Sequence, residues 1–164
     1  MLRRPLNTLL LIAASAISTG AWGLQRCEVD GRSVNPSNGA ETAGLTGLMR
    51  CRDADSGQLQ REQELRNGRV IGLERFFDRD GRLLRERTVN ERGNSHGRVA
   101  EFWPSGQLKR EETADNGRTQ GAVRRFSEQG RLERLAFHAD GREQFVIEYN
   151  AGGQPQRLQC PATS

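Results

Sequence analysis

The chain has 164 residues, and its 25 basic residues only slightly outnumber its 21 acidic ones, leaving a formal net charge of +4. Lys109 is the only lysine, so arginine carries the positive charge. This near balance and the lack of a basic run argue against nucleic acid as a partner, because nucleic-acid affinity comes mainly from cation–phosphate contacts. We expect most arginines to be solvated surface residues that form weak cross-strand ion pairs.

Residues 1–23 have the pattern of an export signal. Arg3 and Arg4 form a charged start, an apolar stretch follows at 9–17, and small residues at 21–23 form a cleavage site. The apolar stretch is too short to span a membrane. We therefore expect cleavage near Gly23 and a mature protein without a transmembrane segment, located in the periplasm or secreted.

Residues 24–56 are expected to form an N-terminal cap. A loop is expected at 35–39, and residues 44–52 have the character of a degraded strand of the repeat described next. The remainder of this segment is expected to be irregular, and helix signals are absent after the export signal. A solenoid requires such an atypical end, because its outermost repeat has no neighbour on one side.

Residues 57–164 are built on a repeat of about 24 residues. One copy consists of Gly97, four residues, Phe102, three residues, Gly106, one residue and Leu108. The Gly-x-Leu steps begin at residues 57, 81, 106 and 130, so the intervals are 24, 25 and 24 residues. A last copy has Pro155 in place of the leucine. Four copies at one period indicate a repeat architecture.

Glycines every 11 to 13 residues predict short strands joined by hairpins. We expect each glycine to be third in a three-residue loop, with positive φ, so that Phe77 lies opposite Leu83 across the turn at Gly81. The same geometry pairs Phe102 with Leu108. The glycines expected to have positive φ at hairpin ends are Gly68, Gly81, Gly106, Gly117, Gly130 and Gly153, with Gly93 and Gly141 in less regular loops.

These aromatic–leucine pairs are expected to form one apolar stripe that is the core of the protein. The side chains predicted to be most buried are Phe77, Leu83, Phe102, Leu108, Phe126 and Leu132. Charged residues alternate with apolar ones on nearly every strand, which is typical of a single-layer sheet wetted on both faces. The sequence therefore predicts an all-β fold, an antiparallel meander of repeated β-hairpins in one extended, twisted sheet.

An open sheet also decides how the cysteines pair. About nine strands spaced at about 4.8 Å would separate Cys51, before the repeats, from Cys160, after them, which is too far for a disulfide. We therefore expect a disulfide between Cys27 and Cys51, in an oxidising compartment, and a Cys160 that is either free or bonded to another molecule. A bond between Cys51 and Cys160 would require the sheet to close on itself.

The repeat unit at 97–108 and its copies resembles MORN repeats (membrane occupation and recognition nexus), in particular the bacterial variant described as an antitoxin component. The resemblance covers roughly residues 45–158. It implies stacked β-hairpins in an extended sheet and a non-enzymatic binding role. The arginine-rich surface, the degenerate ends and the cysteines outside the repeats depart from the family pattern.

The sequence predicts no catalytic, cofactor or metal site. His96 and His138 lie beside turns without zinc-type spacing, so we expect solvated loop histidines. Asp78 and Asp80 faintly resemble a calcium loop, but the later glutamate is missing and turn chemistry accounts for both. The glutamates at the same place in successive repeats indicate a structural ladder rather than a catalytic pair, and they are Glu62, Glu86 and Glu111.

Four residues are candidates for binding a partner: Phe76, Trp103, Arg75 and Arg125. Phe76 and Trp103 each neighbour an aromatic of the expected core, so they are expected on the opposite face. Aromatic residues beside arginines are the composition of protein-binding hot spots. The alternative is a second, minor apolar stripe on that face, which would include Leu84, Val99, Val123, Leu135 and Val146.

Two functions compete on this evidence. The first is an exported, non-enzymatic protein that binds another protein, as an immunity or antitoxin-type neutraliser of a toxin or effector. The second is a cell-envelope scaffold that contacts membrane lipid or cell wall. We favour the first, because a membrane-binding surface would need loops dense in basic residues, and the turns here carry Asp, Glu and Ser.

Overall fold

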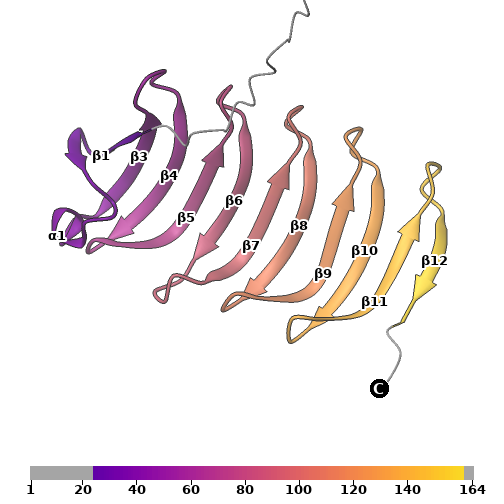
Figure 1. The fold of residues 1–164 in the computed structure, drawn as a ribbon. Coiled ribbons are helices and arrows are strands. Elements are labelled where there is room, and N and C mark those ends of the chain that lie inside the picture. Colours follow the sequence, from indigo (N-terminus) through magenta and orange to yellow (C-terminus); the bar gives the residue numbers. More distant parts are fainter. Residues whose placement is uncertain (1–23, 161–164) are drawn as a thin grey trace, which may run out of the picture.

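Twelve β-strands form one antiparallel sheet in the structure, a computed structural model that describes residues 24–160 (Figure 1). The expected export signal at 1–23 lies outside these described residues. The elements are β1 (Gln25–Val29), β2 (Arg32–Val34), α1 (Gly39–Thr42), β3 (Gly47–Asp53), β4 (Leu59–Arg66), β5 (Arg69–Phe77), β6 (Leu83–Val89), β7 (Ser95–Phe102), β8 (Leu108–Asp115), β9 (Arg118–Phe126), β10 (Leu132–Ala139), β11 (Arg142–Tyr149) and β12 (Pro155–Gln159).

The order of the strands confirms the predicted antiparallel meander. From β4 to β11, each strand pairs with the strands before and after it in sequence. β1 lies between β3 and β2, and the full order is β12-β11-β10-β9-β8-β7-β6-β5-β4-β3-β1-β2. The sheet is therefore open, with β2 and β12 as its two edges. Among the described residues, no helix is long and apolar enough to cross a membrane.

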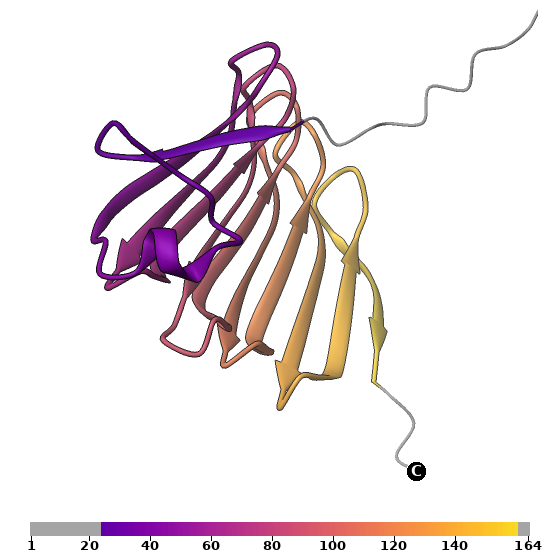
Figure 2. The same ribbon diagram turned by 60° about the vertical axis from the view of Figure 1, so that its left-hand side comes forward.

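The N-terminal cap continues the sheet, so the prediction of an irregular segment at 24–56 is wrong. Asp30 and Gly31, with φ of 49° and 80°, form a two-residue turn between β1 and β2. The short helix α1 was also not expected, and Asn38 caps its start by accepting a hydrogen bond from Ala40 N at 3.1 Å. β3 falls where the degraded strand was predicted. Figure 2 shows the β1–β2 hairpin and α1 at one end of the curved sheet.

The predicted disulfide is confirmed. Cys27 in β1 lies directly opposite Cys51 in β3, with 4.0 Å between the two Cα atoms, and their sulfur atoms are bonded. Both cysteines are buried. Cys160, which follows β12 at the far edge of the sheet, is exposed and is the one free cysteine in the described part of the chain.

At one end of the sheet, the hairpins have the predicted three-residue loops. Asp78 N donates to Arg82 O at 2.9 Å and Gly81 N donates to Asp78 O at 3.0 Å, which closes a loop at 79–81. Phe77 lies opposite Leu83 as expected. The equivalent pairs are also present, and they are Phe102–Leu108 and Phe126–Leu132. All eight glycines predicted at hairpin ends have positive φ.

At the other end of the sheet, the prediction of three-residue loops is wrong for most hairpins. The turns there have two residues, both with positive φ, as type I′ turns require: Asn67-Gly68, Asn116-Gly117 and Asp140-Gly141. The turns also join successive hairpins. Gly117 N donates to Ser95 O at 2.8 Å, and Gly141 N donates to Thr119 O at 3.1 Å.

Three strands bend near their middle, which makes the sheet a trough. Gly72, Gly97 and Gly121 have φ of 103°, 99° and 71°, and the register with the preceding strand shifts beside each of them. Such bulges bend a strand and increase its twist. Figures 1 and 2 show the resulting curvature, with one concave and one convex face.

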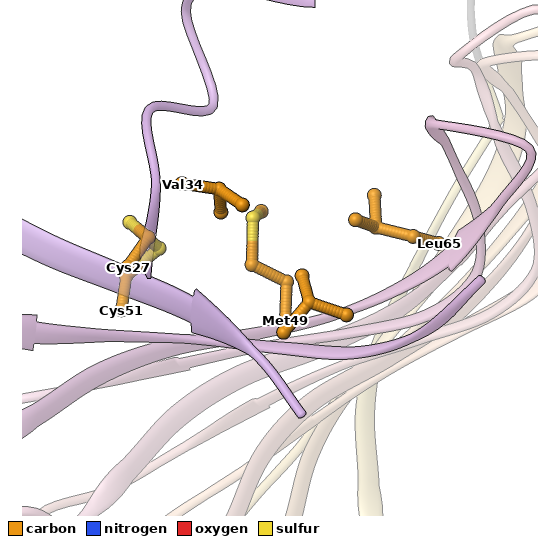
Figure 3. Packing of buried hydrophobic residues seen from close by; sticks show 6 residues of the cluster. Cys27, Val34, Met49, Cys51 and Leu65 are labelled. Atoms are coloured by element: carbon orange, nitrogen blue, oxygen red, sulfur yellow. A yellow bond between two sulfur atoms is a disulfide. The ribbon is translucent and has the colours of Figure 1, made fainter. Parts of the chain in front are cut away.

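The concave face holds the core. Met49, Val99 and Val146 are exposed by only 1%, 2% and 2%. Figure 3 shows Val34, Met49 and Leu65 on the inner side, where the strands curve around them. The buried apolar side chains of this face, from one edge to the other, are Val34, Cys27, Val29, Met49, Cys51, Leu65, Val89, Val99, Ala114, Val123, Ala136 and Val146.

The prediction that the phenylalanine–leucine stripe is the most buried part is therefore wrong. Its members do share one face, as their pairings require, but this is the convex face and their side chains are only half-buried. Val99, Val123 and Val146, assigned to a minor stripe, are core residues instead. Leu84, from the same minor stripe, is exposed by 39%.

Two glycines at equivalent turns test how tightly the cap is docked. A Cβ at Gly68 would lie 2.4 Å from the carbonyl oxygen of Thr42, whereas one at Gly117 would come no closer than 3.8 Å, to the Cβ of Asn94. Both glycines have positive φ, so G117A should cost about 1–2 kcal/mol through backbone strain alone. G68A should cost about 1–3 kcal/mol more, because the end of α1 must shift.

Urea denaturation of the two variants measures this difference. Equal losses of stability would show that the cap moves away from the sheet without resistance.

Candidate functional site

The two faces of the sheet present different chemistry. On the convex face, arginine and glutamate alternate from strand to strand and form a ladder across seven strands. Its members are Arg50, Glu62, Arg75, Glu86, Arg98, Glu111 and Arg124. This agrees with the ladder predicted from the recurring glutamates.

Each inner arginine of the ladder bridges two glutamates. Arg75 lies 3.6 Å from Glu62 and 2.9 Å from Glu86, measured between nitrogen and carboxylate oxygen. The hydrogen bond to Glu86 raises the pKa of Arg75 above its usual value. Arg98 bridges Glu86 and Glu111 at 3.2 and 2.7 Å. The charges of the ladder are therefore paired with one another within residues 24–160.

The ladder stops at β10, where Leu135 occupies the repeat position of the glutamates. Beyond it the convex face becomes apolar. The rings of Phe137 and Phe145 stack with 5.5 Å between centroids, and Phe137 is exposed by 41%. Leu158 in the edge strand β12 is exposed by 66%.

The concave face contains buried polar groups at its N-terminal half. Glu74 is 3% exposed, and it accepts hydrogen bonds from the Gln63 amide and the Arg87 guanidinium. Arg87 also donates to the hydroxyl of Ser95 at 3.1 Å. A buried carboxylate needs such partners, because burying an unpaired charge is costly. This chain of contacts links β4, β5, β6 and β7.

Toward the three-residue loops, the concave face carries a row of arginines. Four of them stand four residues after the repeat glycine, and a fifth lies between them on β9. We call this set the arginine row, and it consists of Arg61, Arg85, Arg110, Arg125 and Arg134. The sequence signal for this row is an arginine two residues after the leucine of each Gly-x-Leu step, a feature that the prediction of partner-binding residues did not include.

The arginine row is unevenly neutralised. Arg110 contacts Glu112 and lies 3.9 Å from Glu101, and Arg134 lies 2.8 Å from Glu143. Within residues 24–160, Arg61, Arg85 and Arg125 form no ion pair with a carboxylate. The Nε atoms of Arg61 and Arg85 are buried and have no hydrogen-bond acceptor among those residues. The row therefore has more cationic groups than the carboxylates of the described residues satisfy.

The structure does not bring the four predicted partner-binding residues into one patch. Arg75 belongs to the convex ladder, whereas Phe76 follows it and lies on the concave face between Arg61 and Arg85. Arg125 is on the concave face too, but three strands separate β9 from β5.

Trp103 has a structural contact that the sequence did not reveal. Its indole Nε1 donates to Phe126 O at 3.1 Å, and the Lys109 ammonium lies 4.6 Å from the ring centroid. At the equivalent position of other copies, Asp78 and Ser127 instead bond the backbone of their own loop. Trp103 therefore joins two neighbouring hairpins, and replacing it should cost stability.

The residues considered for metal binding have other partners. Arg82 donates to the Asp78 carboxylate through its backbone N–H and its guanidinium, and these bonds lower the pKa of Asp78 below its usual value. His96 lies 3.2 Å from Asp115. In the described range, no three His, Cys, Asp or Glu side chains are grouped as metal ligands.

These features define a repeat protein made of stacked β-hairpins, with one self-neutralised face and one arginine-lined face. No protein-family model matches the chain, and no curated protein matches it. A solved structure that aligns with it is described as accessory secretory protein 1, 2 and 3 in Streptococcus pneumoniae, with 15% identity and a TM-score of 0.24. That alignment covers 57% of this chain and 16% of the other.

Proposed function

We propose that this is an exported, non-enzymatic protein that binds another protein stoichiometrically through the concave face. The resemblance to antitoxin-type repeats supports a neutralising role, in which the partner is a toxin or effector. The observation that carries the proposal is the arginine row, because its members share the concave face and their guanidinium groups are only partly neutralised by described carboxylates. Arginine is enriched at protein interfaces.

The disulfide supports the exported part of the proposal. Disulfides persist in oxidising compartments and are rare in the cytosol. The disulfide between Cys27 and Cys51 joins β1 to β3, and β1 follows directly after the expected export signal. The repeated hairpins support the binding role, because each adds two strands to one extended surface.

Arg124 and Arg125 provide a matched test. The two are consecutive and both exposed, but Arg124 ends the convex ladder and Arg125 lies on the concave face. A photo-crosslinking residue at position 125 of the exported protein should form an adduct with a distinct envelope protein. The same photo-crosslinking residue at position 124 should form much less of this adduct. Mass spectrometry of the adducts identifies the partner.

The purified partner then tests stoichiometry and neutralisation. Calorimetry should give a fixed molar ratio, and the partner's toxic or enzymatic activity should fall in proportion to the complex formed. Adducts with lipid or cell-wall polymer instead of protein would contradict the proposal and favour the envelope scaffold. Equal adducts from both positions would contradict the assignment of the concave face.

A further inference from the structure

The convex ladder provides a reference within the same sheet, because its inner arginines are paired with carboxylates on both sides. There, arginines alternate with glutamates, so that Arg75 and Arg98 each have a carboxylate from both neighbouring strands. The concave row has the same strand spacing but not the same alternation. Comparing the two faces of one sheet therefore reveals which carboxylates the concave face lacks among its described residues.

The shortage of carboxylates beside the arginine row is greatest at β8, β9 and β10. Arg110 lies opposite Arg125, and Arg125 lies opposite Arg134, so three arginines follow one another directly across three strands. Like charges directly opposite each other destabilise a sheet. Glu101 and Glu112 both contact Arg110, and Glu143 contacts Arg134, whereas Arg125 is exposed and makes no ion pair within 24–160.

We propose that the arginine row binds an acidic peptide segment, whose carboxylates take the places that glutamates occupy in the convex ladder. This rests on the proposed function and names the chemistry of the partner's contact. The guanidinium group suits it, because its planar fork binds a carboxylate through two parallel hydrogen bonds. Phe76, which lies between Arg61 and Arg85, adds an apolar contact to the same surface.

The distance between successive arginines of the row determines which backbone conformation of the acidic peptide segment fits it. Arg61, Arg85, Arg110 and Arg134 stand on every second strand, which corresponds to about 9.6 Å between successive arginines. A polyproline II helix returns to the same side every three residues, after about 9.3 Å. A segment in this extended form, with an acidic residue at every third position, therefore places one carboxylate at each of these four arginines. Two of those carboxylates would lie on either side of Arg125, which stands between Arg110 and Arg134.

The test uses the mature, disulfide-bonded protein and a fluorescein-labelled peptide with five Glu-Pro-Pro repeats. Fluorescence anisotropy should show binding that weakens as salt rises, since the contacts are ionic. The same peptide with glutamine in place of glutamate should not bind. R125E should weaken binding at least tenfold, whereas R124E, with the same change of net charge, should change it by less than twofold.

The free protein provides a second readout. R125E places a carboxylate between Arg110 and Arg134, so it should raise the thermal midpoint. This also shows that loss of peptide binding does not come from unfolding. R125Q should lie between wild type and R125E in peptide affinity. A fall in the midpoint of R125E would overturn the assignment of Arg125 to a repulsive cluster.

Several results would overturn the proposal. One is no binding of the glutamate peptide, and another is equal loss in R124E and R125E. Tighter, Arg125-dependent binding of inorganic tripolyphosphate would assign the row to phosphate instead. If crosslinks from position 125 still capture an envelope protein, a negative peptide result leaves the proposed function intact and removes only the acidic segment.

Discussion

Replacing Arg87 with methionine is expected to lower the free energy of unfolding by about 3–5 kcal/mol, because it removes one partner of a buried ion pair. The Glu74 side chain is 4% exposed, and Arg87 supplies its only ion pair in the described part of the chain. Methionine keeps most of the aliphatic stem, so the loss reports the charge rather than the packing. Urea denaturation monitored by circular dichroism measures the change.

Arg85 is the matched control. It lies on the same strand and the same face, two residues before Arg87, but forms no ion pair among the described residues and has a buried Nε atom without an acceptor. R85M should therefore change stability by less than about 1 kcal/mol, or raise it. Equal losses in R85M and R87M would show that arginine packing, not the pair with Glu74, stabilises the sheet.

A double variant completes the argument. Replacing both Glu74 and Arg87 with methionine should recover a large part of the stability lost in R87M, because no unpaired charge remains buried. If the double variant is less stable than R87M alone, Glu74 stabilises the sheet by other contacts, with Gln63 as the candidate.

The local geometry of the repeats could be predicted from sequence because it depends on short-range rules. Glycine at a fixed place permits the positive φ that a three-residue loop requires, and that loop sets the register, so the opposition of Phe77 and Leu83 followed directly. The two-residue turns had a signal too, since Asn67-Gly68 and Asn116-Gly117 are typical of type I′ turns. The dipeptide alone does not distinguish the two kinds of turn, because the similar pair Asp80-Gly81 lies in a three-residue loop.

The core could not be assigned to the correct face from alternation alone. A strand places Phe102 on one face and Glu101 on the other, and large apolar residues favour the phenylalanine side as the core. The curvature of the sheet makes the opposite face the more buried one. Bulges such as that at Gly97 close one face around its side chains, so small residues like Val99 lose their solvent contact there. On the convex face the side chains diverge, and Phe102 keeps part of its surface in water.

The candidate site was predicted only in part. Arg125 and Phe76 lie on the arginine-lined face. Arg75 and Phe76 are consecutive residues of one strand, so their side chains point to opposite faces of the sheet. The opposition of Arg110, Arg125 and Arg134 depends on register shifts in two hairpins, and no local pattern specifies those shifts.

Removing the disulfide is expected to destabilise one end of the sheet. The bond closes a loop with a sequence separation of 24 residues, so replacing Cys27 and Cys51 with alanine should cost about 3.5 kcal/mol in the loop-entropy estimate. The N-terminal cluster should respond most, because Cys27 and Cys51 pack with Val29, Val34, Met49 and Leu65. C160A, which removes an exposed and unpaired thiol, is the control and should leave stability unchanged.

Removing the disulfide should open the N-terminal end of the sheet before the whole sheet unfolds. In a repeat sheet each strand contacts mainly its neighbours, so an end unit opens more easily than the interior. Amide hydrogen exchange in the double variant should therefore speed up first in β1 and β2, and least in the central strands β6 to β9. Opening of the cap would also release Gly68 N from Leu45 O. Uniform acceleration across all strands would contradict this, because it would mean that the whole sheet unfolds as one cooperative unit and that the cap has no independent stability.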